Sequence, residues 1–324
     1  MKKRILGSSG LEVSAIGLGC WGMSGAYGAG ARKESIETIH EAVDHGINFI
    51  DTADIYGNGH NELLVGEALK YLRHNIILAT KFGFIGGENE TLRVNGRPDY
   101  VSKACDASLK RLGTDFIDLY YLHRLDKNVP IEDTVGAMSR LVEQGKIRFI
   151  GLSEVSAATL DRAVSVHPVA ALQSEYSLNT RDIEDSVIPA SRKNNIAIVA
   201  FSPLGRALLT LSIKTIDDLE ENDFRRNIPR FQSNNLKKNL QLLNVFKEIA
   251  SYKNITPAQL ALAWLLNRGD DVIPIPGMKT KKYVKENIHS VNITLSPDET
   301  GKLDTIFDNT SGERYSEESG KFIE

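Results

Sequence analysis

The sequence has 324 residues, of which 41% are hydrophobic, and a formal net charge of −3. Charges of both signs are scattered along it, which excludes a broad basic field for nucleic acid and a polybasic membrane surface. Its two cysteines, Cys20 and Cys105, are too few for a disulfide framework, and the sequence shows neither a signal peptide nor a stretch as long as a membrane span. We therefore expect a cytoplasmic protein without nucleic-acid or membrane partners.

The predicted elements begin with a small hairpin, because RILGSSGLEVSAI contains two short strand patterns around a Ser-Gly turn. Nearly continuous apolar runs then predict strands that are buried on both faces. These runs lie at 14–20, 46–51, 75–81, 115–123, 146–153, 169–175, 196–202 and 271–277. Amphipathic stretches between them predict helices, at 33–46, 62–72, 99–113, 131–145 and 158–167.

Eight strands alternating with helices predict an α/β fold, the parallel (β/α)8 TIM barrel. No linker divides the sequence, so we expect a single domain over residues 1–324. The polar stretch 203–235, after the seventh strand, lacks clear periodicity. A loop of that length is usually functional or disordered.

Polar side chains end three successive strands of the predicted barrel. The second strand ends at Asp51 and leads into Tyr56, the third ends at Lys81, and the fourth ends at His123. Each residue alone has an ordinary structural explanation. A lysine and a histidine that end apolar strands nevertheless carry a desolvation cost unless they are paired or used. Because catalytic groups of this fold collect at the carboxyl ends of the strands, we expect the four to form one site.

The four side chains together suit proton donation to an oxygen. A free tyrosine has a pKa of about 10, which a nearby lysine would lower. We expect Lys81 to do this for Tyr56 and Asp51 to hold Lys81 charged. A neutral His123 would then orient the reacting oxygen, whereas Asp54 is expected only to stabilise the loop. Such a site suits carbonyl reduction, whose hydride must come from a cofactor.

At these residues the sequence resembles the aldo-keto reductases. The resemblance is carried by FIDTADIYGNGHNELLVGEAL, ILATKFG, DLYYLHR, IGLSE, LQSEYSL, FSPLGR and IPIPGMKTKKYVKEN, in that order. The motifs LHR, GLSE and DFRRNIPRF resemble the pyridoxal reductase-like, auxin-induced-type branch. The resemblance implies a (β/α)8 barrel that uses NADPH without a Rossmann domain to reduce aldehydes or ketones to alcohols. It also gives Tyr56 the role of general acid and makes the enzyme an NADP-dependent oxidoreductase.

The resemblance further implies a set of cofactor contacts. Ser153 and Gln173 match residues that hold the nicotinamide carboxamide, and Phe201 matches an aromatic residue that stacks on the ring. Glu154 stands where asparagine is commoner, and a carboxylate cannot donate a hydrogen bond to the carboxamide oxygen. The other matched positions are Ser202, Leu204 and Arg206 near the diphosphate, Gly277 and Lys279 near the 2′-phosphate, and Glu286 and Asn287 near the adenine.

Two of the matched cations face phosphate groups in this assignment. Arg206 is the expected partner of the diphosphate. Lys279 precedes a predicted helix, whose N-terminus is an anion site. By contrast, Arg225 and Arg226 in the long loop could close over the phosphates, but we expect them to be solvated.

The expected substrate is a small carbonyl compound that sits against an aromatic wall. Trp21 and Tyr27 follow the first strand on the same rim, and Trp21 matches a position that faces the substrate in the family. Arg124 either selects a negative group on the substrate or pairs with Asp126. The patterns indicate no metal site.

Two other classes of function remain open at this point. One is a barrel lyase in which Lys81 forms a Schiff base. The other is a regulatory subunit that senses nicotinamide nucleotides with little turnover. Multiple-turnover NADPH oxidation with a panel of aldehydes separates these alternatives from a reductase.

Overall fold

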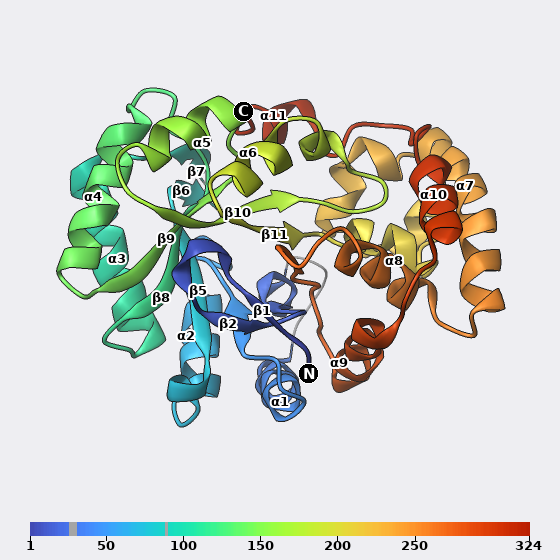
Figure 1. Ribbon diagram of the computed structural model, residues 1–324, viewed down its shortest axis with the longest axis horizontal. Coiled ribbons are helices and arrows are strands. Elements are labelled where there is room, and N and C mark those ends of the chain that lie inside the picture. The colour runs from blue at the N-terminus through green and yellow to red at the C-terminus, as the bar shows by residue number, and fades with distance from the viewer. Residues whose placement is uncertain (26–30, 88–89) are drawn as a thin grey trace.

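Eight parallel strands curl into a barrel surrounded by helices (Figure 1). The computed structural model describes residues 1–25, 31–87 and 90–324. In the sheet the strands follow the order β3 (Leu18–Gly19), β4 (Phe49–Asp51), β5 (Ile77–Phe82), β8 (Ile117–Leu122), β9 (Ile147–Ser153), β10 (Val169–Glu175), β11 (Ala197–Phe201) and β12 (Val272–Pro274). A parallel bridge from Gly19 to Gly277 joins the two edges, so the (β/α)8 barrel is closed. All eight predicted strands are confirmed.

Helices follow the strands and pack on the outside of the sheet (Figure 1). They are α1 (Arg32–Asp44), α2 (His60–Leu69), α3 (Pro98–Leu112), α4 (Ile131–Glu143), α5 (Ala157–Val164), α6 (Val187–Lys193), α8 (Pro257–Leu266) and α9 (Lys281–Ile288). The five helices predicted from amphipathic stretches are confirmed as α1 to α5. No helix in the described part of the chain has both the length and the apolar character needed to cross a membrane.

The predicted N-terminal hairpin forms and closes one end of the barrel. Its strands β1 (Lys3–Ile5) and β2 (Glu12–Ser14) pair antiparallel. Leu6 and Val13 are fully buried in the same cluster as Phe49 and other side chains of the barrel interior. At the turn, Gly7 has a φ of 52°, and an added Cβ would lie 2.3 Å from the carbonyl oxygen of Ala170, near the start of β10. The hairpin therefore fills the amino ends of the strands and leaves the carboxyl ends for chemistry.

Three additional segments extend the barrel at its other end. They are the hairpin of β6 (Phe84–Gly87) and β7 (Glu90–Val94), the long loop after β11, and the C-terminal tail, which we define as residues 312–324. The loop contains short 3₁₀ helices at Gly205–Thr210, Ile216–Asp218, Phe224–Asn227 and Pro229–Phe231, and it ends where α7 (Ser233–Tyr252) begins. Helix α10 (Pro297–Ile306) packs on α7, and α11 (Glu317–Gly320) lies within the tail.

The prediction that Arg225 and Arg226 are solvated is wrong. Arg225 forms a 2.6 Å ion pair with Asp223 and donates a hydrogen bond to the carbonyl of Arg206. Arg226 donates to the carbonyl of Leu219 at 2.7 Å. Carbonyl groups in a segment without regular secondary structure need such partners, and these guanidinium groups supply them. The long loop is held in place by its own side chains.

Candidate active site

The structure brings Asp51, Tyr56, Lys81 and His123 together at the carboxyl ends of β4, β5 and β8. The Lys81 ammonium donates to Asp51 Oδ1 at 2.5 Å, to the Thr52 carbonyl at 2.8 Å and to Tyr56 Oη at 3.1 Å. Lys81 is fully buried, and Asp51 is 2% exposed. An ammonium has three hydrogens to donate, so every one of them has a partner.

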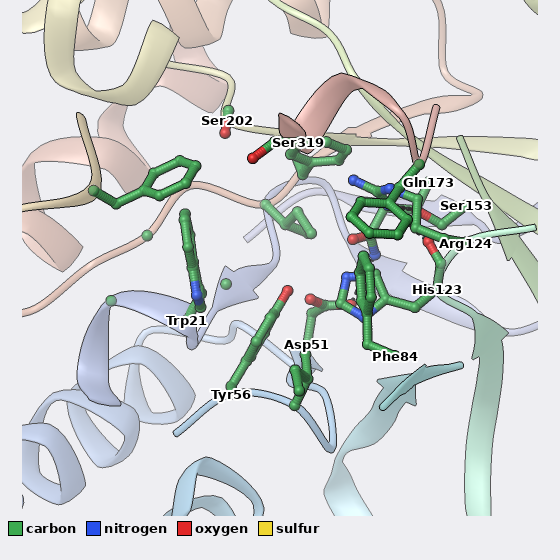
Figure 2. Close-up of a pocket in the computed structure, with 18 of the residues that line it drawn as sticks. Trp21, Asp51, Tyr56, Phe84, His123, Arg124, Ser153, Gln173, Ser202 and Ser319 are labelled. Carbon is green, nitrogen blue, oxygen red and sulfur yellow. Dashed lines mark hydrogen bonds between the residues drawn. The ribbon is translucent and has the colours of Figure 1, made fainter. Parts of the chain in front are cut away.

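The loop that carries Tyr56 is fastened to neighbouring strand ends. Thr52 Oγ1 donates to Asn61 Oδ1 at 2.6 Å, and Asn61 Nδ2 donates to the Cys20 carbonyl at 2.9 Å. The backbone N–H of Asp54 donates to the Lys81 carbonyl at 3.1 Å. These bonds fix both ends of the loop, so the Tyr56 hydroxyl is held in reach of Lys81 and points into the cavity (Figure 2).

Burial dominates the electrostatics of the site. Burial by itself would lower the pKa of Lys81, but the Asp51 carboxylate and the Tyr56 hydroxyl more than offset it, and the pKa is raised above its ordinary value. Burial raises the pKa of Tyr56, and Lys81 opposes this only in part. Lys81 acts in the predicted direction and lowers the pKa of Tyr56, but desolvation of the buried phenolate outweighs the attraction of the cation, so the net pKa is raised. Tyr56 therefore stays protonated at neutral pH and can act as a donor.

His123 is held in its neutral form. Burial lowers its pKa well below the ordinary value, and the positive charges of Arg124 and Lys81 lower it further. Its ring packs edge-on against Tyr56, with 5.8 Å between the centroids. Within the described residues its Nδ1 atom is buried without a hydrogen-bond partner. His123 also lines the cavity beside Tyr56, where a neutral imidazole is suited to a polar group of a ligand.

Three of the four residues, Asp51, Tyr56 and His123, line a cavity of about 290 Å³, while Lys81 is fully buried beside them. Figure 2 shows the ring of Trp21 across the cavity from His123 and Arg124. Its lining includes the predicted residues Trp21, Asp51, Tyr56, His123, Arg124, Ser153, Gln173, Phe201, Ser202, Arg206 and Gly277. The predicted pocket residue Tyr27 lies outside the described residues.

Sequence reasoning missed the outer wall of this cavity, which the three additional segments form. Phe84 and Leu92 come from the β6–β7 hairpin, Phe224 from the long loop, and Tyr315, Ser319 and Phe322 from the tail. Phe224 packs edge-on against Trp21 at 5.6 Å, so the predicted aromatic wall is extended by the loop. The available signal was a few aromatic residues in otherwise polar segments.

Ion pairs fasten the tail to the barrel. Arg314 pairs with Glu154 at 2.9 Å and with Asp182 at 3.2 Å. At the end of the chain, the Glu324 carboxylate accepts from the Ser156 N–H at 2.9 Å and from Thr159 Oγ1 at 2.7 Å, where it caps the start of α5. The tail thus reaches the cavity by contacts with residues more than a hundred positions away in the sequence.

Two predicted cofactor residues have other partners in this structure. Glu154 does not line the cavity, because its carboxylate accepts from the Glu175 N–H at 2.7 Å and pairs with Arg314. Gln173 lines the cavity but donates to Asp51 Oδ2 at 2.8 Å, so it braces the carboxylate that holds Lys81.

The remaining cofactor positions lie on the rim and around the start of α9. Arg206 lines the cavity and forms an ion pair with Glu175 at 2.8 Å. Leu204, two residues earlier in the chain, does not line the cavity. Within the described part of the chain, no side chain caps the N-terminus of α9, which begins two residues after Lys279 and carries Glu286 and Asn287. Uncapped N–H groups at a helix start can bind an anion.

These features fit a phosphorylated nicotinamide dinucleotide. The Phe201 ring and the Ser153 hydroxyl line the cavity that Tyr56 enters, and they can hold a flat amide-bearing ring. The Ser153 hydroxyl accepts from Arg124 at 3.1 Å and keeps its own hydrogen for a carbonyl oxygen.

Comparisons with known proteins agree on one family. The model of the aldo/keto reductase family matches residues 15–308. The NADP(+) aldo-keto reductase yakc of Schizosaccharomyces pombe is 46% identical over 319 residues, which are 96% of this chain and 94% of that protein. A solved glycerol dehydrogenase of Gluconobacter oxydans superposes with a TM-score of 0.84 at 31% identity, over 93% of each chain. An aldo/keto reductase of Klebsiella pneumoniae, solved with NADP and acetate, has a TM-score of 0.74 at 29% identity, over 98% of this chain and 99% of its own.

Proposed function

We propose, from the premise that this chain belongs to the aldo/keto reductase family, that Tyr56 is the general acid of its reaction. The reaction is the NADPH-dependent reduction of an aldehyde or ketone to an alcohol. The observation that carries the assignment is the contact between the buried, charged Lys81 and the hydroxyl of Tyr56 at 3.1 Å, at the edge of the cavity.

Each of the four residues has a separate task in this mechanism. NADPH, when bound, supplies the hydride for the carbonyl carbon. Tyr56 donates its proton to the carbonyl oxygen, and Lys81 stabilises the phenolate that remains. Asp51 keeps Lys81 charged, with support from the amide of Gln173. His123 is neutral and therefore does not add a second positive charge beside Lys81.

Around the reacting atoms, a second group of residues suits the cofactor. Phe201 and Ser153 hold the nicotinamide, and Gly277, Lys279 and the start of α9 receive the phosphate. Arg206 is the proposed partner of the diphosphate, and Glu175 holds its guanidinium in place. Glu154 is proposed to anchor the tail instead of touching the cofactor, because both of its oxygens have protein partners.

The geometry disfavours a Schiff base on Lys81. A lysine must lose its proton before it can attack a carbonyl group. Here three hydrogen bonds and the Asp51 carboxylate hold the proton on Lys81, and its pKa is raised.

The substrate is proposed to be a flat aldehyde. Trp21, Phe84, Phe224 and Phe322 present apolar surface to the cavity, which suits an aromatic or conjugated ring. This agrees with the pyridoxal reductase-like branch that the motifs indicate, and pyridoxal belongs in the first substrate panel. We further propose that the chain is one domain and acts in the cytoplasm, where its two buried free cysteines stay reduced.

Replacement of Tyr56 by phenylalanine tests the assignment. Loss of a general acid costs about 10² to 10⁴ in rate, so Tyr56→Phe should bind NADPH and reduce aldehydes at that lower rate. NADPH fluorescence measures binding, and NADPH oxidation measures turnover. Tyr315→Phe is the matched control, because it removes another hydroxyl of the same cavity. Equal losses in the two variants would contradict the role of Tyr56, and a wild type without turnover would favour a nucleotide sensor.

A further inference from the structure

Arg124 follows His123 in the chain, lines the cavity and is buried, with only 7% of the residue exposed. Its Nη1 atom donates to the His123 carbonyl at 2.7 Å and to Ser153 Oγ at 3.1 Å. Its Nη2 atom lies 3.5 Å from the Tyr315 hydroxyl. Among the residues that the structure describes, these neutral groups are its polar contacts, and no carboxylate forms an ion pair with it.

The absence of a counter-charge distinguishes Arg124 from the other buried arginine of the cavity. Arg206 pairs with Glu175 at 2.8 Å. The expected alternative partner of Arg124, the carboxylate of Asp126, accepts instead from the N–H groups of Gly96 and Asn128, both at 3.0 Å. That prediction of an Arg124–Asp126 pair is wrong. A buried cation without an anion carries a large desolvation cost.

The guanidinium of Arg124 lies close to two aromatic rings that line the cavity. The guanidinium carbon lies 5.8 Å from the centre of the Phe84 ring and 6.0 Å from that of Phe201. Nε and one hydrogen of Nη2 are not used by the hydrogen bonds described above. An anion that enters the cavity beside His123 therefore meets unused donors and a positive charge in a site of low polarity.

We propose that Arg124 is the receptor for an anionic group, a carboxylate or phosphate, on the carbonyl substrate. This inference rests on the proposed reductase function and adds a substrate class to it. The aromatic walls take the flat body of the substrate, Tyr56 and His123 take the carbonyl oxygen, and Arg124 takes the anion. A guanidinium forms short, charge-assisted hydrogen bonds with both kinds of anion.

A different role for Arg124 would be electrostatic. Its charge lowers the pKa of His123 and opposes the rise in the pKa of Tyr56. Such an effect acts on the catalytic groups and changes the turnover of every substrate alike. An anion receptor changes the KM of charged substrates relative to neutral ones. The ratio between matched substrates therefore separates the two roles.

The test compares 4-carboxybenzaldehyde with its neutral analogue 4-methylbenzaldehyde, and pyridoxal 5′-phosphate with pyridoxal. The wild type should show the higher kcat/KM for the charged member of at least one pair, and the pair identifies the anion. In Arg124→Met that preference should fall by about tenfold to a hundredfold, mainly through KM, because a hydrogen bond to a charged group is lost. Arg124→Lys keeps the charge without the planar fork and should show an intermediate preference.

Two outcomes would overturn the proposal. One is a wild type that prefers the neutral member of both pairs, a result that needs no variant to fold. The other is an equal loss for charged and neutral substrates in Arg124→Met, which would leave only the electrostatic role. Failure of the reductase function itself looks different, because the wild type would then oxidise NADPH with none of the four aldehydes.

Discussion

The two sides of the cavity are built in different ways. The inner side, which carries Asp51, Lys81 and His123, consists of strand ends in a closed ladder of backbone hydrogen bonds. The outer side consists of the β6–β7 hairpin, the long loop and the tail, and side-chain ion pairs such as Arg225–Asp223 and Arg314–Glu154 hold the loop and the tail in place. We infer that the barrel fixes the chemistry and that the additional segments select the substrate. The predictions below test this division.

The largest effect is expected on the inner side, for Lys81→Met. The change leaves the Asp51 carboxylate buried without its cation, and removal of one partner of a buried pair costs about 3–5 kcal/mol of unfolding free energy. Activity should fall by about 10² to 10⁴ or more, because Tyr56 loses the group that stabilises its phenolate. Urea unfolding and NADPH oxidation measure the two effects.

The double variant Lys81→Met, Asp51→Leu separates stability from catalysis. It replaces both charges with apolar groups, and such replacements are often neutral or stabilising. Its unfolding free energy should exceed that of Lys81→Met, while its activity stays as low. A double variant less stable than the single one would show that the buried pair is not the source of the loss.

On the outer side, Arg314→Met should loosen the tail and leave the barrel folded. Without its ion pairs the tail opens locally, so hydrogen exchange over 312–324 should rise. Loss of the Tyr315 and Phe322 contacts with a substrate should raise KM roughly tenfold with a smaller change in kcat. If kcat fell as much as in Lys81→Met, the outer side would take part in the chemistry.

Arg162→Met is the matched control for Arg314→Met. Arg162 forms an ion pair with Glu132 through two hydrogen bonds. Both side chains are exposed, and neither residue lines the cavity. Exposed pairs contribute about 0–1 kcal/mol. This control should therefore leave KM unchanged, and it should raise hydrogen exchange in the tail less than Arg314→Met does, because Arg162 is linked to the tail by the attraction of the Glu324 charge and not by an ion pair.

The sequence predicts the inner side well because its signals are local. Buried parallel strands require unbroken apolar runs, and all eight were visible in the sequence. Polar residues such as Lys81 stand at the carboxyl ends of those runs, and parallel strands bring these ends together. The identity of the four central residues followed from that rule and from their chemistry.

The outer side was not predictable from such patterns. Phe224 and Tyr315 lie in polar segments without periodicity, and only contacts distant in sequence bring them to the cavity. Glu154 was predicted to face the cofactor, yet its backbone has a left-handed φ of 54° and its carboxylate meets Arg314, 160 positions further along the chain. No short window of sequence contains both partners of such a pair.

The smallest effect is expected for Asp54→Asn, which tests whether the carboxylates of Asp51 and Asp54 have different roles. Asp54 fastens the loop through its backbone N–H, which the variant keeps, so activity should change only a few-fold. Asp51→Asn weakens the charge pair that holds Lys81 and should lose about a hundredfold or more. Equal losses in the two variants, measured by NADPH oxidation, would mean that both carboxylates serve the chemistry.

The same variant has a distinct pH signature. Burial, followed by the nearby Glu62 carboxylate, raises the pKa of Asp54 to about 8, against the pull of Arg111 and Lys81. The unfolded value is about 3.9. Between these values the folded chain holds a proton that the unfolded chain has released, so this group's contribution to stability falls as pH rises from about 4 to 8. Asparagine cannot ionise, so the unfolding free energy of Asp54→Asn should decline less than that of the wild type between about pH 5 and pH 8. Parallel urea curves for the two proteins across this range would show instead that Asp54 is ionised in the folded state.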